Sequence, residues 1–220
     1  MRSEPIVRAL HEANPGATSK ALARAGSYEK LWSRVRGTRV LDLACGDRPM
    51  PGAIGLDLVR ERGIAVQGRV QQLPFADGAF DAALCHLAFM LFDDIEAVVA
   101  ELRRVLAPGA TFHALLGGGP VADGEDAYHV FARLMPPSPP MGDPRSKRPE
   151  GWRDLFRGWS EPGFERWELD LTGSFDDVWL FLGASYSLHD ADRVKRELRA
   201  AFPADPVPCR VACYYASVTR

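Results

Sequence analysis

A short stretch of the chain combines small residues with two carboxylates at a spacing that suits nucleotide chemistry. The segment 42–46 reads DLACG after one apolar run, and the next apolar run ends in GLD at 55–57. Small residues let the backbone approach a ligand closely, and Gly46 can adopt conformations that side chains forbid. The carboxylate of Asp57 can accept two hydrogen bonds from ribose hydroxyls. A tight turn followed by a helix-capping aspartate is the alternative interpretation.

The elements that must position these residues alternate between strands and helices. Apolar runs predict strands at 38–45, 53–58, 64–68, 80–87, 110–116, 164–171 and 210–218. Helical patterns cover 5–12, 19–25, 28–35, 95–107, 126–135, 151–157, 175–184 and 191–202. Alternation of this kind predicts an α/β fold with a mostly parallel sheet covered on both faces. The ligand crevice of such a sheet lies outside the carboxyl ends of its strands, where segment 42–46 begins.

Length and charge limit the classes of protein. A chain of 220 residues suits one core, and 27 basic against 29 acidic residues give a net charge of -2. This balance disfavours nucleic acid or an anionic membrane as a partner. The start lacks the apolar run of a signal peptide, and no later run approaches the roughly 20 apolar residues that cross a bilayer. We therefore expect a cytoplasmic protein of unknown oligomeric state.

Four cysteines, Cys45, Cys85, Cys209 and Cys213, are too few and too scattered for a disulfide framework. Cys209 and Cys213 fall in a predicted strand, where a small buried sulfur is the commoner role. We expect reduced thiols and no metal site.

Four ordered motifs resemble the class I S-adenosylmethionine (SAM) dependent methyltransferases of the small-molecule type. They are VLDLACG from residue 40, GLDL from 55, LPFADGAFDAALCHLAFML from 73, and ELRRVLAPGA from 101. Each motif is weak alone, but their order is specific. A less specific similarity to malonyl-carrier-protein O-methyltransferases continues through FDDVWLFLGAS and the last strand. The resemblance implies a Rossmann-like, seven-stranded, mostly parallel sheet with an antiparallel last strand.

The resemblance also implies a division of labour along a single domain spanning residues 1–220. An N-terminal helical lid would occupy 1–36, a SAM-binding core 37–119, an acceptor-binding insertion 120–160, and strands and helices completing the sheet 161–220. The family pattern assigns the backbone of Ala44, Cys45 and Gly46, preceded by Asp42, to the methionine part of SAM. It assigns Asp57 to the ribose, and Leu58, Val70 and Gln71 to the adenine. It assigns Cys85 and His86 to the methionine amino group and the transferring methyl.

Three departures from the family pattern concern the cofactor. Ala44 and Arg48 stand where glycines are usual, and Arg69 replaces an acidic residue that accepts a hydrogen bond from the adenine amino group. Gln71 or Gln72 could substitute as the acceptor. The segments before and after Asp57 are also short and rich in proline and glycine, so some helices of one flank should be truncated.

Methyl transfer from a sulfonium is an in-line displacement, so the protein must align the acceptor, exclude water and, for a hydroxyl acceptor, remove a proton. His86 follows a strand into the predicted crevice, and we expect it to be the base or to orient the acceptor. A polar residue that only hydrogen-bonds the loop is the alternative, and His113 is the second candidate. Acceptor contacts are expected from the insertion, at Tyr128, His129, Phe131 and Trp152. An exposed helix face explains Tyr128 and His129 equally well, and aromatic residues spaced like Phe131 and Trp152 are more often core.

The expected reaction yields S-adenosylhomocysteine (SAH) and a methylated small-molecule or carrier-bound acceptor, with oxygen as the first choice of acceptor atom. A nicotinamide-dependent reductase would need GxGxxG, which this chain lacks. A SAM-binding module without catalysis is the more serious alternative, because the glycine loop is altered and Arg69 replaces an acid.

Overall fold

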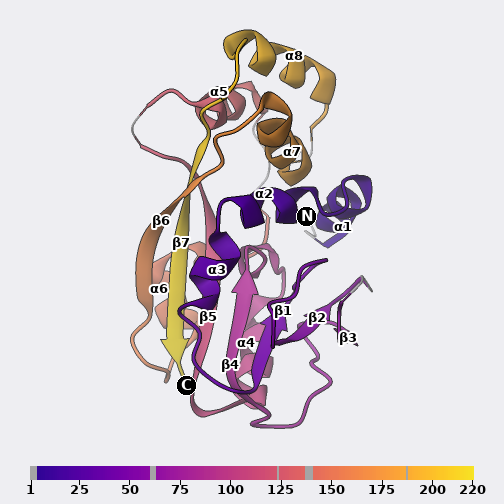
Figure 1. Ribbon diagram of the computed structural model, residues 1–220. Helices are drawn as coiled ribbons and strands as arrows, with labels where there is room; N and C mark the ends of the chain where they lie inside the picture. Colours follow the sequence, from indigo (N-terminus) through magenta and orange to yellow (C-terminus); the bar gives the residue numbers. More distant parts are fainter. Residues whose placement is uncertain (1–3, 60–62, 123, 137–140, 187) are drawn as a thin grey trace.

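The computed structural model describes residues 4–59, 63–122, 124–136, 141–186 and 188–220. Seven strands form one sheet in the order β3-β2-β1-β4-β5-β7-β6 (Figure 1). Their bounds are β1 (Val40–Leu43), β2 (Ile54–Asp57), β3 (Val66–Gln67), β4 (Phe80–His86), β5 (Leu106–Pro120), β6 (Gly163–Asp170) and β7 (Arg210–Thr219).

The pairing of the strands confirms the predicted sheet. Strands β1 to β5 pair in parallel, and β7 lies antiparallel between β5 and β6. In this register Asp42 lies opposite Gly55 on β2 and Leu84 on β4. The carboxyl ends of β1, β2 and β4 therefore meet at one edge, which places the segments after Leu43, Asp57 and His86 together.

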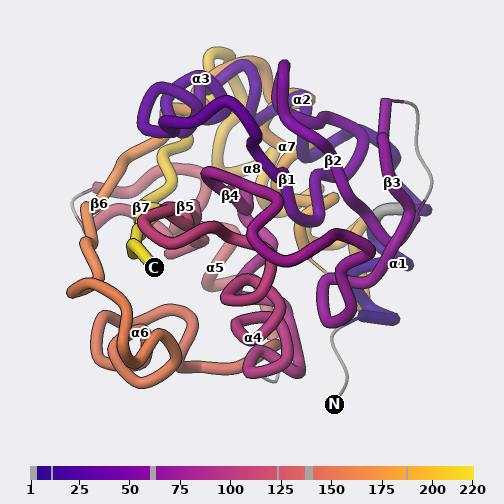
Figure 2. Tube along the Cα trace, turned by 90° about the horizontal axis from the view of Figure 1, so that it is seen from below, coloured from indigo at the N-terminus to yellow at the C-terminus, as the bar shows by residue number. Residues whose placement is uncertain are grey.

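Helices cover both faces, as predicted. The α-helices are α1 (Glu4–Ala13), α2 (Ala17–Arg24), α3 (Ser27–Trp32), α4 (Ile95–Val105), α5 (Ala127–Leu134), α6 (Pro149–Leu155), α7 (Phe175–Ser185) and α8 (Ala191–Ala201), with short 3-10 turns η1 (Phe89–Leu91) and η2 (Pro144–Lys147). Seen along the sheet in Figure 2, α2 and α3 lie on one side and α4 and α6 on the other. Helices α5, α7 and α8 gather beyond the upper end of the sheet in Figure 1. Within the described residues, no helix combines the length and apolar character required to cross a membrane.

The sheet separates two hydrophobic clusters because its central strands are buried on both sides. Helix α4 shows how sequence produces this: its buried residues Ile95, Val98, Val99, Leu102 and Val105 recur at helical spacing. They pack with Phe112 and Trp152 on the face of α4 and α6. The opposite cluster joins residues of α2, α3, α5, α7 and α8. Removing this apolar surface from water is the main stabilising term of the fold.

Two boundaries around β5 differ from the sequence prediction. Helix α4 ends at Val105 rather than at residue 107, because Ala107 precedes Pro108 and such a residue avoids the helical conformation. The strand that follows runs from Leu106 to Pro120, so it continues beyond the predicted end at residue 116 through three glycines. This extension carries β5 past the edge where β4 ends.

The predicted truncation is present between β1 and β2. Residues 44–53 form turns and irregular backbone without a helix. The backbone NH of Met50 donates to the Asp42 carboxylate at 2.8 Å, which ties this short connection to the strand it leaves.

Candidate functional site

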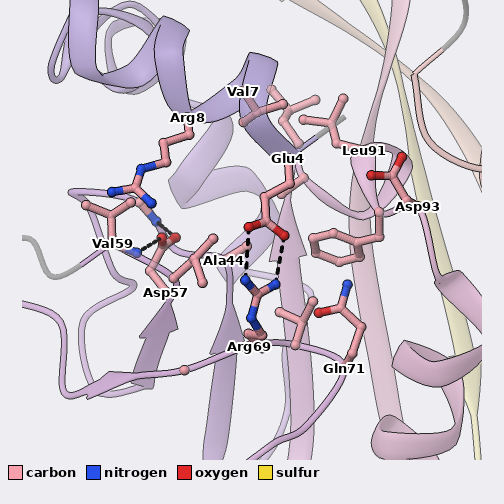
Figure 3. Close-up of a pocket in the computed structure, with 17 residues that line it drawn as sticks. Glu4, Val7, Arg8, Ala44, Asp57, Val59, Arg69, Gln71, Leu91 and Asp93 are labelled. Atoms are coloured by element: carbon pink, nitrogen blue, oxygen red, sulfur yellow. Dashed lines mark hydrogen bonds and ion pairs between the residues drawn. The ribbon is translucent and has the colours of Figure 1, made fainter. Parts of the chain in front are cut away.

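A cavity of about 280 Å³ lies at the carboxyl ends of β1, β2 and β4 (Figure 3). We call it the first cavity. Helix α1 lies over it, and the turn after β3 and the segment after β4 complete its wall. Its lining residues are Glu4, Val7, Arg8, Ala44, Gly46, Asp57, Leu58, Val59, Gly68, Arg69, Val70, Gln71, Leu87, Ala88, Leu91, Phe92 and Asp93.

The loop after β1 and the end of β2 meet in this wall. One carboxylate oxygen of Asp57 accepts from the backbone NH of Gly46 at 2.8 Å, and the other accepts from Val59 at 3.0 Å. A carboxylate offers about four lone-pair sites, so Asp57 keeps capacity for two further donors. A Cβ atom on Gly46 would meet nothing within 4 Å, so the cavity reaches this backbone. These features fit a ribose diol beside a closely approaching chain.

Asp42 lies beneath the same loop and is buried. One of its carboxylate oxygens accepts from Met50, while the other is buried without a hydrogen-bond partner. Burial and, to a smaller extent, the nearby charge of Asp57 raise the pKa of Asp42 to about 7. Asp42 does not line the first cavity, so its contribution is to the shape of the loop above it.

The positions where glycines are usual behave differently from each other. Ala44 lies in the left-handed region at φ 53°, which costs an alanine roughly 1–2 kcal/mol, and it lines the first cavity. Arg48 is exposed, and its guanidinium lies 5.5 Å from the ring centre of Tyr28. The altered loop therefore leaves space at Gly46 but brings the methyl group of Ala44 to the wall.

Arg69, which stands in place of an acid, pairs with a carboxylate from another element. Its guanidinium donates to both oxygens of Glu4 on α1, at 2.8 and 3.1 Å. Figure 3 shows this bidentate pair at the cavity wall, with Gln71 below it. The pair fixes the first turn of α1 over the cavity and brings a carboxylate back to the region of position 69.

A second cavity, of about 360 Å³, adjoins the first. Val7, Leu87 and Leu91 line both cavities, so the two meet at these three side chains. One face of α1 roofs both spaces, because Val7 lines both cavities and Leu10, three residues later, lines the second. Asn14, just after the helix, continues this wall. Most of the remaining wall comes from α2, α5, α7 and the extended parts of β5 and β7, and Asp47, Met90, Met141 and Lys147 complete it.

Leu87 occupies a special backbone position at this junction. It follows β4 with φ 57°, and its backbone NH donates to Leu115 at 2.8 Å. A left-handed leucine is a strained conformation that the surroundings must enforce. Leu87 and Ala44 are the two non-glycine residues with positive φ among those described, and both line the first cavity.

His86 immediately precedes Leu87 at the junction of the two cavities, but its side chain lines neither cavity. Its Nε2 lies 2.9 Å from the Ser27 hydroxyl, and its ring stacks on Tyr28 with centroids 4.0 Å apart. Because the Ser27 hydroxyl donates its proton to Leu22 at 3.0 Å, we assign the proton of this contact to Nε2. Burial lowers the pKa of His86 to about 3, which makes it a weak base.

Three further predicted residues lie in structural settings away from both cavities. His113 is buried within β5, where its Nδ1 lies 2.8 Å from the Tyr215 hydroxyl and burial lowers its pKa to about 4. His129 completes a capping box with Asp126 at the start of α5. Trp152 is fully buried on the α4 and α6 face and donates to the Ser146 carbonyl at 2.7 Å.

Of the other predicted acceptor contacts, Tyr128 lines the second cavity and its hydroxyl bonds that of Tyr186. Phe131 is buried behind this pair, with its ring centroid 5.3 Å from that of Tyr186. Residues 137–140 of the predicted acceptor-binding insertion lie outside the described residues.

The predicted cofactor positions divide between the cavity wall and its support. Ala44, Gly46, Asp57, Leu58, Val70 and Gln71 line the first cavity, whereas Asp42, Cys45, Cys85 and His86 lie behind it. All four cysteines are unbonded and buried. In the part of the chain that the structure describes, no group of three or more potential ligand side chains could hold a metal ion.

The sequence alone does not reveal the contributions of Glu4, Leu87 and Tyr186 to the two cavities. The helical spacing of Val7, Leu10 and Asn14 was a signal for a roof, but it did not show what the roof covers. Glu4 and Tyr186 reach their partners from positions 65 and 58 residues away, and no local pattern indicates such contacts.

Comparison with known proteins finds similarity to methyltransferases. Residues 49–114 match the family model of a methyltransferase domain. Over 109 residues, the chain is 35% identical to the malonyl-[acyl-carrier protein] O-methyltransferase of Serratia marcescens, covering 47% of this chain and 39% of the relative. A 95-residue match to the demethylmenaquinone methyltransferase of Thermus thermophilus is 37% identical and covers 32% of this chain and 43% of the relative.

The fold is similar to that of the YcgJ protein from Bacillus subtilis, with a TM-score of 0.54 at 19% identity over 92% of this chain and 98% of the other. A seven-stranded sheet with this order and a cavity at its carboxyl edge defines the Rossmann-like methyltransferase fold. The matched methyltransferase domain contains three of the four motifs that resemble the class I SAM-dependent methyltransferases, GLDL, LPFADGAFDAALCHLAFML and ELRRVLAPGA. The chain spans less than half the length of each of these two curated relatives.

Proposed function

We propose that the protein transfers a methyl group from SAM to an oxygen atom of a small-molecule or carrier-bound acceptor. The observation that carries this proposal is the meeting of two cavities at Val7, Leu87 and Leu91. One cavity has the residues for a nucleoside, and the other has space for a second molecule. A direct transfer requires this arrangement, because donor and acceptor must approach along one line.

The residues of the first cavity suit the parts of SAM. Asp57 would accept from the ribose hydroxyls, Leu58 and Val70 would enclose the adenine, and the Gly46 backbone would lie along the methionine part. SAM supplies the reactive methyl group on its sulfonium. The protein contributes alignment and exclusion of water, which α1 provides by roofing both cavities.

We assign His86 a positioning role within this proposal. Its contact with Ser27 and its stacking on Tyr28 hold the end of β4, and thereby Leu87, at the junction. Its low pKa is unfavourable for a general base, which works best near the operating pH. A His86→Asn variant should therefore lose rate without losing an acidic limb from its pH profile, whereas loss of that limb would restore the base hypothesis.

The proposal is tested by calorimetry and turnover together. We expect the protein to bind SAH in a one-to-one complex and to form SAH from SAM when an acceptor is present. The oxygen acceptor and the carrier are supported by the Serratia relative's name, and a panel of hydroxyl, carboxyl and amine acceptors would test them. Absence of binding of both SAM and SAH would refute the proposal, and binding without turnover of any acceptor would favour a non-catalytic module.

A further inference from the structure

The shape and lining of the second cavity indicate the class of acceptor. This inference rests on the proposed function, in which SAM occupies the first cavity and the acceptor occupies the second. The floor of this cavity is the part of β5 that extends beyond β4. Gly117 and Gly118 line the cavity, and the pairing of β5 with β7 shifts register between Gly117 and Gly119. The absence of side chains along this run leaves the floor open.

Gly117 is the floor residue nearest to the junction. A Cβ atom there would lie 3.2 Å from the terminal methyl of Met90 and 3.9 Å from a methyl of Leu87, both of which line the cavity. Its φ lies outside the left-handed region, so its backbone accepts other residues. Gly118 is different, because its Cβ would lie 2.4 Å from the carbonyl oxygen of Ala212. Gly117 therefore keeps space open for a ligand, whereas Gly118 is required by strand packing.

The wall formed by α5, α7 and β7 is apolar and uncharged. It consists of Tyr128, Phe181, Ala184, Ser185, Tyr186, Val211 and Cys213. Burial raises the pKa of the Tyr128 hydroxyl and raises that of the Cys213 thiol to about 11, so both are neutral. A charged group in this part of the cavity would be desolvated without a counter-ion, which is costly.

Charged residues of the second cavity lie on other elements. Among its described lining residues, one carboxylate and one ammonium occur, at Asp47 and Lys147. Asp47 follows β1 and accepts from the Ser19 hydroxyl of α2 at 3.1 Å. Lys147 is exposed at the end of η2. Neither belongs to the wall made by α5, α7 and β7.

The same wall nevertheless offers hydrogen bonds to a neutral group. The hydroxyls of Tyr128 and Tyr186 bond each other, and because only one of the two protons lies between them, the pair keeps one proton to donate. The Ser185 hydroxyl oxygen is buried with no hydrogen-bond partner among the described residues. A buried unpaired hydroxyl is costly, and a ligand atom could satisfy it.

We propose that the acceptor is an elongated, mainly apolar molecule that lies over Gly117 and ends in an uncharged hydrogen-bonding group at Tyr128, Tyr186 and Ser185. Its methyl-accepting atom would lie at the opposite end, beside Leu87. This assigns Gly117 as a residue that determines acceptor size, and it assigns the tyrosine pair as the residues that select a neutral end group.

Three matched eight-carbon probes test this inference on SAH-saturated protein by calorimetry: 1-octanol, octanoate and octylamine. At pH 7.5, where octanoate and octylamine are charged, we expect octanol to bind at least about tenfold more tightly than either. Equal or tighter binding of a charged probe would overturn the inference. Tyr186→Phe should reduce the preference for octanol, and an unchanged preference would contradict the role of the tyrosine pair.

The size of the cavity is tested by a matched pair of variants on one strand. Gly117→Val should weaken octanol binding at least about fivefold, because its methyls occupy the space beside Met90 and Leu87. Gly119→Val is the control, since a Cβ there meets nothing within 4 Å and Gly119 is absent from the cavity wall. Equal effects of the two substitutions would refute the inference. If Gly117→Val does not fold, Gly117→Ala paired with Gly119→Ala repeats the comparison with a smaller expected effect.

The outcomes also separate this inference from the proposed function. A protein that binds no SAH refutes the proposed function itself. A protein that binds SAH but shows no preference for the neutral probe refutes only the identity of the acceptor class.

Discussion

The buried carboxylate of Asp42 makes the stability of the protein depend on pH. Its pKa rises from the ordinary value of 3.8 to about 7, because burial disfavours the charged form and because Asp57 lies nearby. The folded state therefore binds this proton more tightly than the unfolded state. Stability from this group is fully present below about pH 4 and is lost as the pH rises through 7.

The magnitude follows from these two pKa values. The whole difference of about three pKa units corresponds to about 4 kcal/mol at 1.36 kcal/mol per unit, an upper limit for this group. Between pH 5.5 and pH 8.5 the linkage relation gives a loss of about 2 kcal/mol. Asp42→Asn removes the titration while an amide oxygen can still accept from Met50.

Urea unfolding of both proteins at pH 5.5 and 8.5 measures this effect. We expect the wild type to lose about 2 kcal/mol more of its free energy of unfolding than Asp42→Asn when the pH is raised from 5.5 to 8.5. Asp77→Asn is the control, because the Asp77 side chain is 81% exposed and far from the loop in sequence. A stability difference that stays constant with pH would refute the claim that Asp42 is buried and protonated near neutrality.

Three further predictions concern the loop, the roof and the core. Ala44→Gly should fold and bind SAH. Ala44→Val should lose about 2 kcal/mol or more of the free energy of unfolding in urea and bind SAH more weakly, because a β-branched residue resists the left-handed region. Equal behaviour of the two variants would contradict this. Glu4→Gln should weaken SAH binding about two- to fivefold at low salt and less at high salt, since it removes the exposed pair with Arg69; a salt-independent effect would argue against an ionic contact. Trp152→Phe should lose about 1–3 kcal/mol of stability, because it removes the bond to Ser146. It should leave SAH affinity unchanged, because Trp152 does not line the first cavity; altered affinity would return Trp152 to the site.

The sheet and the first cavity could be predicted because they depend on local patterns and on chain order. The apolar runs indicated the strands, and the resemblance carried by the four motifs implied how the strands form a sheet. Ligands of such sheets bind outside the carboxyl ends of the strands, which placed Gly46 and Asp57 at one edge. Helix α4 ends two residues before its predicted end, because the residue before Pro108 avoids the helical conformation.

Tertiary contacts account for what could not be predicted. His86 follows a strand into the crevice, as its position indicates, yet the sequence does not show that Ser27 and Tyr28 would cover its ring. Trp152 was expected as an acceptor contact, although aromatic residues at helical spacing are more often core, and its packing against Phe89 and Phe112 places it in the core. The loss of the acid at position 69 is offset by Glu4, which no local pattern relates to Arg69.

Binding of SAH to the wild type and to Asp57→Ala tests the central claim most directly. Asp154→Ala is the control, because the exposed Asp154 side chain of α6 lines neither cavity. We predict one-to-one binding by the wild type, because the nucleoside would occupy the first cavity, and an unchanged affinity for Asp154→Ala. For Asp57→Ala we predict an affinity at least about tenfold weaker, since hydrogen bonds to a charged acceptor contribute about 1.5–3 kcal/mol. Wild-type affinity in Asp57→Ala, or no binding by the wild type, would contradict the placement of the cofactor in the first cavity.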